Sequence, residues 1–262
     1  MLQTPCIIAI SIDNGRYKKK TADGNCKVAE HLSQRTHTAR IFVDAIREND
    51  DLWRSGNGLA VECVIGEKVK PIRPSRKPVW FIGDSITAGI HVNGDKEPET
   101  NSYVESYTNV ASNLLGLANV PIAYGATGIT TAGSGGVPKA SDYLNFDMAG
   151  VPDQCEQPEW VVLNYGTNDR KNRKVFLTEY RQYIYQLLDR VHSIPIIILK
   201  PFVGVYSKEI DILASEFPNV FPVNTSDWEA SYTDDLHPDS YGSKLLGIEL
   251  ARVITDILNR KN

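Results

Sequence analysis

Long apolar runs and an N-terminal export signal are both missing from this sequence of 262 residues. No stretch of about 18 apolar residues occurs, so no transmembrane helix is expected. The first ten residues carry no positive charge ahead of their short apolar run, so they do not resemble a signal peptide. These absences predict a cytoplasmic protein, or a secreted one whose export signal lies outside this sequence.

Cysteine is scarce, with four residues at positions 6, 26, 63 and 155. The sequence has no Cys-x-x-Cys pair and no cluster of histidines near a cysteine, so a structural zinc site is not expected. Cys6, Cys26 and Cys63 all precede residue 64, which leaves a disulfide among them open. Buried free thiols are the more ordinary interpretation.

The chain also has no excess of positively charged residues. The chain has 28 Lys and Arg against 32 Asp and Glu, which gives a net charge of −4. This balance predicts neither a nucleic acid nor an anionic membrane as a partner. The one basic cluster, residues 16–20, is short and follows a turn signal, and we interpret it as a solvated loop. The sequence gives no indication of the oligomeric state.

The patterns that are present change near residue 75. Before it, short apolar runs separated by Asn-Gly and Asp-Gly turns predict antiparallel strands. Residues 70–78 contain three prolines, which is typical of a linker because proline donates no backbone hydrogen bond. We therefore expect a small β-rich domain over residues 1–75 and a larger domain over 76–262. The three apolar runs span residues 6–12, 38–43 and 59–65.

Beyond residue 75, apolar strands alternate with helical patterns. Residues 175–191 place their apolar side chains on one helical face, and a final helix with a less regular stripe, from Tyr241 to Leu258, follows Pro238. This alternation predicts a parallel sheet with right-handed crossovers, and ligands then bind beyond the carboxyl ends of the strands. The predicted strands span residues 79–82, 120–124, 160–164, 194–199 and 220–223.

Two of the predicted strands run directly into polar turns. The first ends in Gly83-Asp84-Ser85, which places a hydroxyl at the sheet edge, as either a helix cap or a nucleophile. The second leads into Gly166-Thr-Asn168-Asp169. A side-chain amide there can donate to a developing oxyanion, although Asn and Asp are also common turn formers.

A carboxylate and a histidine lie just before the last helix. Asp234 precedes His237 by three residues across a tight turn, so its carboxylate can reach one imidazole nitrogen while the other takes a serine proton. Asp235 is the adjacent alternative, and the three-residue spacing favours Asp234. We expect no such carboxylate partner for the other four histidines, at positions 31, 37, 91 and 192.

Together these stretches resemble the GDSL/SGNH hydrolase superfamily over residues 79–260. The resemblance implies a flavodoxin-like three-layer α/β/α domain. It makes Ser85 the nucleophile, with its own N–H in the oxyanion hole, and it makes Asp234 and His237 the activating pair. Asn168 would be a further oxyanion donor. The family's oxyanion glycine corresponds to Gly128 in the stretch Ala123-Tyr-Gly-Ala-Thr-Gly128, with Gly125 as the alternative donor or with a structural role for these glycines.

The region before the linker looks like the β-sandwich, here a partial jelly roll, that precedes the catalytic domain of family 2 carbohydrate esterases. The likeness rests on residues 36–45 and on the proline-rich join. It implies a carbohydrate O-acetylesterase that needs no metal or organic cofactor. The polar stretch 91–99 after the serine disfavours a long-chain lipase. Tyr165 and Trp228 could stack on a sugar ring, and core packing is the alternative for both.

Two other functions stay open at this point. One is a different esterase of the same superfamily, such as a lysophospholipase or a thioesterase, which would prefer longer acyl chains. The other is a glycan-binding protein that keeps the scaffold without catalysis. The complete set of Ser85, Asn168, Asp234 and His237 favours an enzyme over a binding protein.

Overall fold

The fold is taken from a computed structural model, which describes residues 4–22, 24–54, 57, 63–72 and 77–259. Its centre is a five-stranded sheet in the order β10-β9-β8-β4-β5, with every neighbouring pair parallel. This order is that of a flavodoxin-like sheet, as the sequence predicts. The strands are β4 (Val79–Gly83), β5 (Asn119–Ala123), β8 (Trp160–Asn164), β9 (Ile196–Leu199) and β10 (Val220–Val223).

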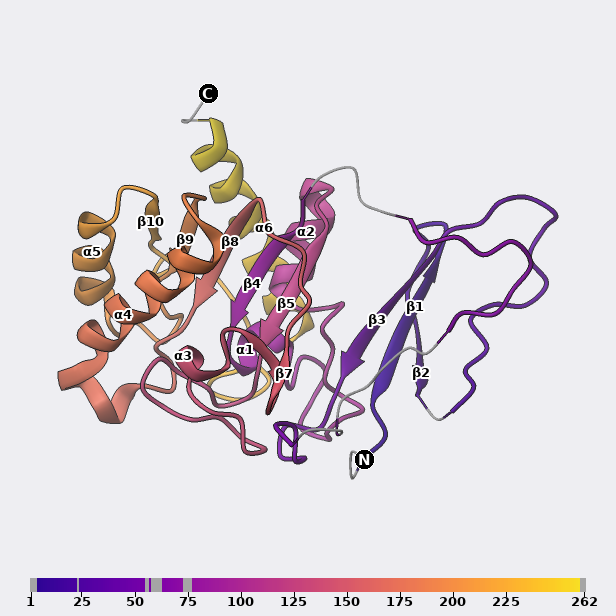
Figure 1. The fold of residues 1–262 in the computed structure, drawn as a ribbon, viewed down its shortest axis with the longest axis horizontal. Coiled ribbons are helices and arrows are strands. Elements are labelled where there is room, and N and C mark those ends of the chain that lie inside the picture. The colour runs from indigo at the N-terminus through magenta and orange to yellow at the C-terminus, as the bar shows by residue number, and fades with distance from the viewer. Residues whose placement is uncertain (1–3, 23, 55–56, 58–62, 73–76, 260–262) are drawn as a thin grey trace.

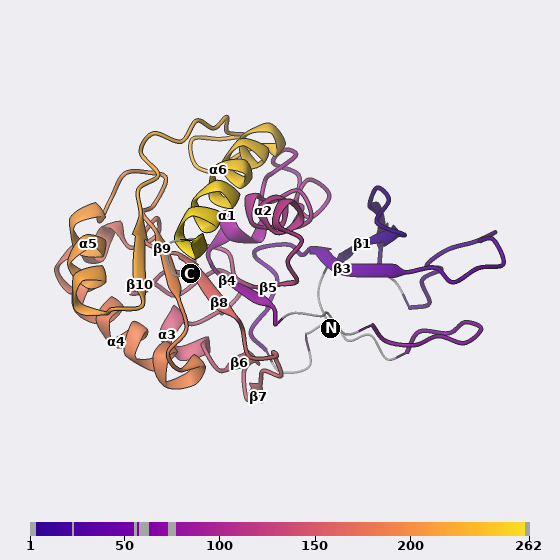
Figure 2. The same ribbon diagram turned by 90° about the horizontal axis from the view of Figure 1, so that it is seen from above.

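Helices cover both faces of this sheet, which gives the predicted three layers (Figures 1 and 2). One layer contains α2 (Tyr107–Leu115) and α6 (Ser240–Asn259), and the other contains α4 (Arg173–Val191) and α5 (Ser207–Glu216). Because both faces are covered, every residue of β4, β8 and β9 is buried, and these strands are continuous apolar runs rather than alternating ones.

The buried face of α4 is the one that its apolar spacing predicts, whereas the buried face of α6 agrees with the prediction only in part. In α4, Phe176, Tyr180 and Ile184 are fully buried, as their spacing predicts. In α6, the predicted stripe is wrong at Tyr241 and Ile248, which are exposed. Its later residues, Val253, Ile257 and Leu258, are partly buried against the core. The buried face includes two glycines and a serine, which a search for large apolar residues overlooks. The glycines let the helix lie close to its neighbours, because a Cβ on Gly247 would meet Val110 of α2 and one on Gly242 would meet the Ser231 backbone. That face consists of Gly242, Ser243, Leu246, Gly247, Leu250, Ala251 and Ile254.

The N-terminal part is a three-stranded antiparallel sheet in the order β2-β1-β3. Its strands are β1 (Ile7–Ile12), β2 (Lys18–Thr21) and β3 (Ala39–Ala45). The interpretation of residues 16–20 as a loop was wrong, because the exposed lysines form an edge strand, where charged side chains prevent further pairing. The described residues form one sheet here and show no second sheet packed on it, and predicted strand residues 59–62 lie outside them.

The end of β3 and the chain after it pack onto the larger part. The buried carboxylate of Asp44 accepts hydrogen bonds from Val104 N–H and from Ser102 Oγ. Further along, the Trp53 ring meets Tyr124 edge-on. Residues 44–53 therefore lie against the parallel-sheet part, and the predicted boundary near residue 75 stays a prediction.

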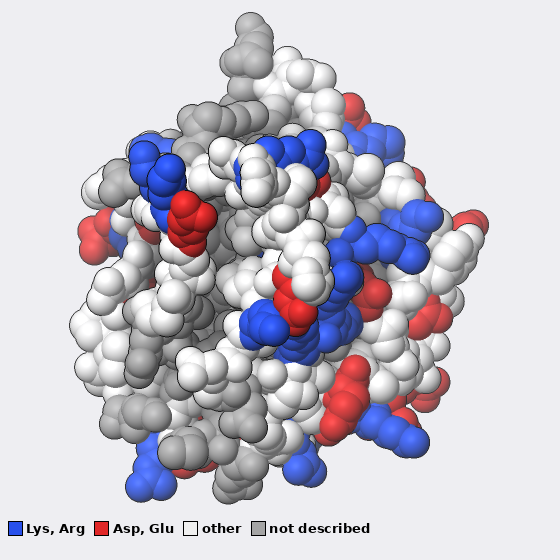
Figure 3. Space-filling view, turned by 90° about the vertical axis from the view of Figure 1, so that its right-hand side faces the viewer, with Lys and Arg blue, Asp and Glu red and all other residues white. Residues whose placement is uncertain are grey.

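Charges of both signs are interspersed on the face that carries the N-terminal sheet (Figure 3). Lys19, from the basic cluster, pairs with Asp44 and Glu105 at 3.1 Å and 3.3 Å. This lysine is therefore neutralised by neighbouring carboxylates.

All four cysteines are free thiols, and only Cys6 is fully buried. No helix among the described residues is long and apolar enough to cross a membrane. The remaining elements are short. They are α1 (Ser85–Ala88), α3 (Ala140–Tyr143), β6 (Phe146–Met148), β7 (Val151–Pro152) and the 3-10 helix Arg170–Asn172.

Candidate active site

The predicted site residues gather at the carboxyl edge of the parallel sheet. Ser85 follows β4, and Asn168 follows β8, the neighbouring strand. The chain adds β5 on one side of β4 and then returns to place β8 on the other side. This reversal opens a crevice at the ends of β4 and β8, which is where α/β sheets bind ligands.

A helix start holds Ser85 in place. Asp84 is the N-cap of α1, and its carboxylate accepts the Ile86 N–H at 3.0 Å. Ser85 is the first helical residue, where N–H groups lack helical acceptors and the helix dipole is positive. Gly83 has no room for a side chain, because a Cβ would lie 2.3 Å from Thr87 Oγ1. The serine is therefore fixed by its cap and by close packing beneath it.

His237 lies between Ser85 and Asp234. Its Nε2 is 2.9 Å from Ser85 Oγ, and its Nδ1 is 2.9 Å from Asp234 Oδ2. With the proton on Nδ1, the ring donates to the carboxylate and leaves Nε2 to accept the hydroxyl proton. The imidazole is largely buried. The structure thus joins in one hydrogen-bonded chain the three residues that the sequence predicted to act together.

Asp234 is strongly stabilised as an anion. Its Oδ1 accepts the backbone N–H groups of Leu236 and His237 at 2.8 Å and 2.6 Å, within a tight turn. Partial burial acts to raise the pKa of this carboxyl, but these bonds and those from two imidazoles lower it well below its usual range. Asp235, the sequence alternative, is exposed.

His91 and Glu97 belong to the same network, and sequence reasoning missed both. His91 Nδ1 lies 3.1 Å from Asp234 Oδ2, and its Nε2 lies 3.0 Å from Glu97 Oε1. The expectation that no other histidine has a carboxylate partner was therefore wrong, and His37 also contacts a carboxylate, that of Asp13, at 2.7 Å. His91 and Asp234 are 143 positions apart, so spacing along the chain gave no signal for their contact.

The oxyanion donors are arranged differently from the prediction in one respect. The Gly128 N–H donates to Thr131 O at 2.9 Å, so this glycine is not a free donor. Its other contact explains the residue type, because a Cβ would lie 2.5 Å from Asp169 Oδ1. The structure favours a structural role for Gly128, and Gly125 takes its place as the candidate donor.

Gly125 and Asn168 both follow strands at the carboxyl edge of the sheet. Gly125 lies just beyond β5, and its N–H has no acceptor among the residues that the structure describes. The Asn168 side-chain amide donates to Thr127 O at 2.9 Å and to Asp84 Oδ2 at 3.3 Å. These contacts hold the amide at the carboxyl edge of the sheet. Both of its hydrogens have acceptors within the protein, so donation to an oxyanion requires that the longer bond, to Asp84, is exchanged for a bond to the substrate.

Glu48, from the segment after β3, reaches this region. A Cβ on Gly125 would lie 2.1 Å from Glu48 Cγ, so only glycine allows this close approach. Ser134 Oγ donates to Glu48 Oε1 at 3.1 Å. Burial raises the pKa of the Glu48 carboxyl, while the nearby imidazoles of His91 and His237 act to lower it. The N-terminal part of the chain thus contributes a carboxylate beside the candidate oxyanion donors.

Two buried carboxyl groups, those of Asp84 and Asp169, hydrogen-bond the loops that carry the site residues. Asp84 is fully buried, and burial is the main cause that raises its pKa to about 7. Asp169 accepts the Thr130 N–H at 2.7 Å and the Ile129 N–H at 3.2 Å, which fixes the loop after Gly128. Burial also raises the pKa of Asp169. Both groups therefore act on the shape and the charge of the site from inside the protein.

The two aromatic residues proposed for sugar stacking have different surroundings. Tyr165 is fully buried, with its hydroxyl bonded to that of Tyr143, so the prediction that it stacks on a sugar was wrong. Residues next to a buried parallel strand point into a core on either face, which the sequence pattern does not distinguish from a site. Trp228 packs against Phe202 at 6.2 Å between ring centroids and stays partly accessible.

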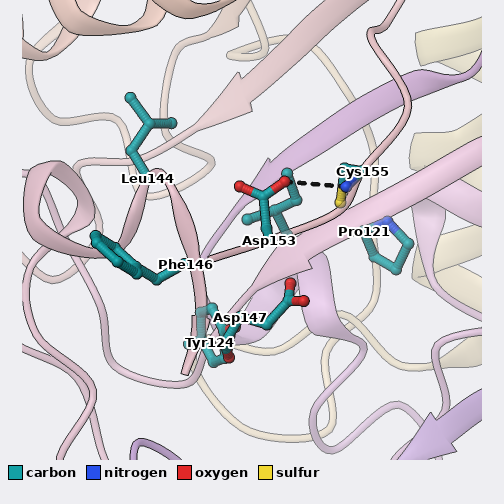
Figure 4. Close-up of a pocket in the computed structure, with 8 residues that line it drawn as sticks. Pro121, Tyr124, Leu144, Phe146, Asp147, Asp153 and Cys155 are labelled. Atoms are coloured by element: carbon teal, nitrogen blue, oxygen red, sulfur yellow. Dashed lines mark hydrogen bonds between the residues drawn. The ribbon is translucent and has the colours of Figure 1, made fainter. Parts of the chain in front are cut away.

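A small cavity of about 50 Å³ lies along β5 (Figure 4). Its lining includes Pro121, Phe146 and Cys155 and none of the predicted site residues. Burial raises the pKa of the Cys155 thiol to about 11, so this cysteine is not an activated nucleophile. This cavity is therefore not the candidate site.

Comparison with solved structures identifies the fold. A family 2 carbohydrate esterase from Clostridium thermocellum, in complex with cellohexaose, is similar over 98% of this chain and 87% of its own, with a TM-score of 0.78 and 19% identity. The chain has the fold of family 2 carbohydrate esterases. No protein-family model matches the sequence, and comparison with curated protein sequences finds no match.

Two further structures with this fold give the same result. A family 2 carbohydrate esterase with a carbohydrate binding domain, from Corynascus thermopiles (Myceliophthora fergusii), is similar over 99% of this chain and 89% of its own (TM-score 0.74, 15% identity). The acetyl xylan esterase Est2A from Butyrivibrio proteoclasticus is similar over 97% and 84% (TM-score 0.74, 16% identity). The SGNH-type α/β fold predicted from the sequence is thereby confirmed.

Proposed function

We propose that this chain is a serine esterase that removes small acyl groups, acetyl above all, from carbohydrates. The observation that carries the proposal is the position of the His237 imidazole, 2.9 Å from Ser85 Oγ and 2.9 Å from Asp234 Oδ2. A hydroxyl, an imidazole and a carboxylate in this order are the working parts of a serine hydrolase.

The proposed reaction is a two-step acyl transfer. His237 Nε2 accepts the proton of Ser85 Oγ, which attacks the ester carbonyl, and the protonated imidazole then gives that proton to the departing alcohol. The Ser85 N–H, the Gly125 N–H and the Asn168 amide are the candidate donors to the oxyanion. Water, activated by the same imidazole, then releases the acid from Ser85. Apart from this water, the steps use only side-chain and backbone groups of the protein.

Three observations support a carbohydrate ester as the substrate. Structures similar over nearly the whole chain are those of carbohydrate esterases, one of them in complex with cellohexaose. The Glu48 carboxylate beside Gly125 offers an acceptor for a sugar hydroxyl. The stretch 91–99, next to the serine, is polar, which suits a hydrated substrate better than an acyl chain.

Acetate release from a panel of acetylated polysaccharides tests this proposal. We expect release by the wild type and by Ser226→Ala, a matched change at an exposed serine, and none by Ser85→Ala. Acetyl esters should also be hydrolysed faster than octanoyl esters. Faster hydrolysis of octanoyl esters would favour a lipid esterase or thioesterase instead. Glycan binding without any acetate release would favour a binding protein.

A further inference from the structure

The two imidazoles around Asp234 have the arrangement of a transition-metal site. His91, Asp234 and His237 each offer one ligand atom, and these atoms lie within 4.8 Å of one another. Asp234 Oδ2 is 3.1 Å from His91 Nδ1 and 2.9 Å from His237 Nδ1. A tetrahedral zinc ion with bonds of about 2.05 Å separates its ligand atoms by about 3.3 Å. Two of the three separations are therefore within about 0.4 Å of this value, and the two rings need only small rotations to bind one ion.

The surroundings of the cluster are also those of a metal site. Metal-binding histidines usually donate their second N–H to a carboxylate, and His91 Nε2 lies 3.0 Å from Glu97 Oε1. The Asp234 carboxylate is fixed by two backbone N–H groups on Oδ1, which leaves Oδ2 directed at the imidazoles. Its side chain is 42% exposed, so solvent and ions reach it. A set of two nitrogens and one oxygen suits Zn²⁺ better than Mg²⁺ or Ca²⁺.

We propose that His91, Asp234 and His237 bind a zinc ion that reversibly switches off the esterase. Zinc displaces the protons that His91 Nδ1 and His237 Nδ1 donate to Asp234. The His91 proton is released to solvent, and the His237 proton passes through solvent to Nε2 of the same ring. The ring then presents an N–H to Ser85 Oγ in place of a lone pair. His237 no longer accepts the serine proton, and acyl transfer stops. His91 makes the site, because without it zinc has only two protein ligands.

Zinc binding is measurable without catalysis, so its test is separate from that of the esterase function. Calorimetric titration of ZnCl2 into full-length Ser85→Ala should show one zinc per chain. In the Ser85→Ala background, His91→Gln removes a zinc ligand. Loss of a residue that only hydrogen-bonds a ligand weakens metal binding by roughly tenfold, so His91→Gln should weaken it by more than that. Adding Glu97→Gln, which keeps the size of the side chain, should weaken it by about tenfold. Adding His31→Gln, at a side chain that is 94% exposed, should change nothing.

The inhibition itself rests on the proposed function and is measured on the wild type. Hydrolysis of an aryl acetate should fall as ZnCl2 is added and recover with EDTA. The inhibition should be lost in His91→Gln relative to that variant's own zinc-free rate. Unchanged zinc affinity after His91→Gln, or binding that disappears when the exposed Cys63 is changed to serine, would overturn the proposal. Zinc binding to Ser85→Ala with no esterase activity in the wild type would instead overturn the proposed function alone.

Discussion

The Asp234 carboxylate has hydrogen-bond partners on both of its oxygens, from Leu236, His237 and His91. Its Oδ1 shapes the turn that carries His237, while its Oδ2 faces the imidazoles of His237 and His91. A side chain with 42% exposure would otherwise be mobile and solvated. The bonds on both oxygens hold it in one orientation, which orients the imidazole next to the serine.

Asp234→Asn should therefore remove most of the activity without unfolding the protein. An amide donates where the carboxylate accepts, which favours the wrong imidazole tautomer, and this substitution lowers kcat by about 10⁴ in a serine protease. Asp235→Asn is the matched control at the exposed neighbouring carboxylate. Steady-state kinetics with an aryl acetate measures both variants. Equal losses in the two would show that Asp234 has no special part in the reaction.

Among individual residues, the sequence predicted those site residues that directly follow a strand or precede a helix. It did not predict those that lie in irregular loops. Ser85, Asn168 and the Asp234–His237 pair each stand beside a readable strand end or helix start. His91 and Glu48 lie in irregular segments. His91 has a positive φ of 58°, which the sequence pattern does not predict. The resemblance favoured Gly128 over Gly125 as the oxyanion donor, and the hydrogen bond from Gly128 N–H to Thr131 within the folded loop reverses that preference.

Among the secondary-structure elements, the strands of the parallel sheet could be predicted from the sequence because they are continuous apolar runs. Its five strands were predicted to within about two residues at their ends, as buried strands between polar turns allow. The edge strand Lys18–Thr21 was not, because its four exposed residues carry no apolar alternation, and its position depends on pairing with β1.

One buried carboxylate, that of Asp44, contributes to the attachment of the N-terminal sheet. Asp44 accepts hydrogen bonds from Ser102 and Val104, and it also pairs with Lys19. Asp44→Ala leaves the buried Val104 N–H without its acceptor, which costs about 1–3 kcal/mol. Urea denaturation should show this loss in the free energy of unfolding. Asp95→Ala, at an exposed loop carboxylate, should leave it within about 0.5 kcal/mol of the wild type. No difference between the two variants would contradict the anchoring role.

At the scale of the whole molecule, the N-terminal part takes part in the site as well as standing beside it. Glu48 lies against Gly125, and its backbone N–H donates to Glu97 Oε2 at 2.6 Å. Glu97 in turn bonds His91. The segment after β3 is therefore connected to the residues around Asp234.

Glu48→Ala should affect carbohydrate substrates more than small esters. A hydrogen bond from a sugar hydroxyl to a carboxylate contributes about 1.5–3 kcal/mol, so KM for an acetylated oligosaccharide should rise by about tenfold or more. KM for an aryl acetate, which has no sugar hydroxyl, should stay near that of the wild type. Glu67→Ala, at an exposed carboxylate, is the matched control. Equal changes for both substrates would show that Glu48 does not contact the sugar.

The buried carboxyl of Asp84 makes the stability of the whole protein depend on pH. Its pKa of about 7 in the folded state lies above the ordinary 3.8, so the folded protein holds a proton that the unfolded chain releases. Its contribution to stability is then greatest below pH 4 and is lost between about pH 4 and pH 7, by at most about 4 kcal/mol. Asp234 has the opposite shift, so the comparison is with Asp84→Asn, which removes the Asp84 effect alone. As the pH rises from about 4 to about 7, the free energy of unfolding of the wild type should fall relative to that of Asp84→Asn, by up to about 4 kcal/mol. Urea denaturation at several pH values measures this, and a difference between the two proteins that stays constant or changes in the opposite direction would contradict it.

The proximity of His237 to Ser85 is tested most directly by labelling with a fluorophosphonate, followed by peptide mass spectrometry. Only a serine activated by a base reacts rapidly with such a reagent. We predict one label per chain, on Ser85, in the wild type, and a label that disappears in His237→Asn. A label on another serine, or unchanged labelling of Ser85 after His237→Asn, would contradict the mechanism.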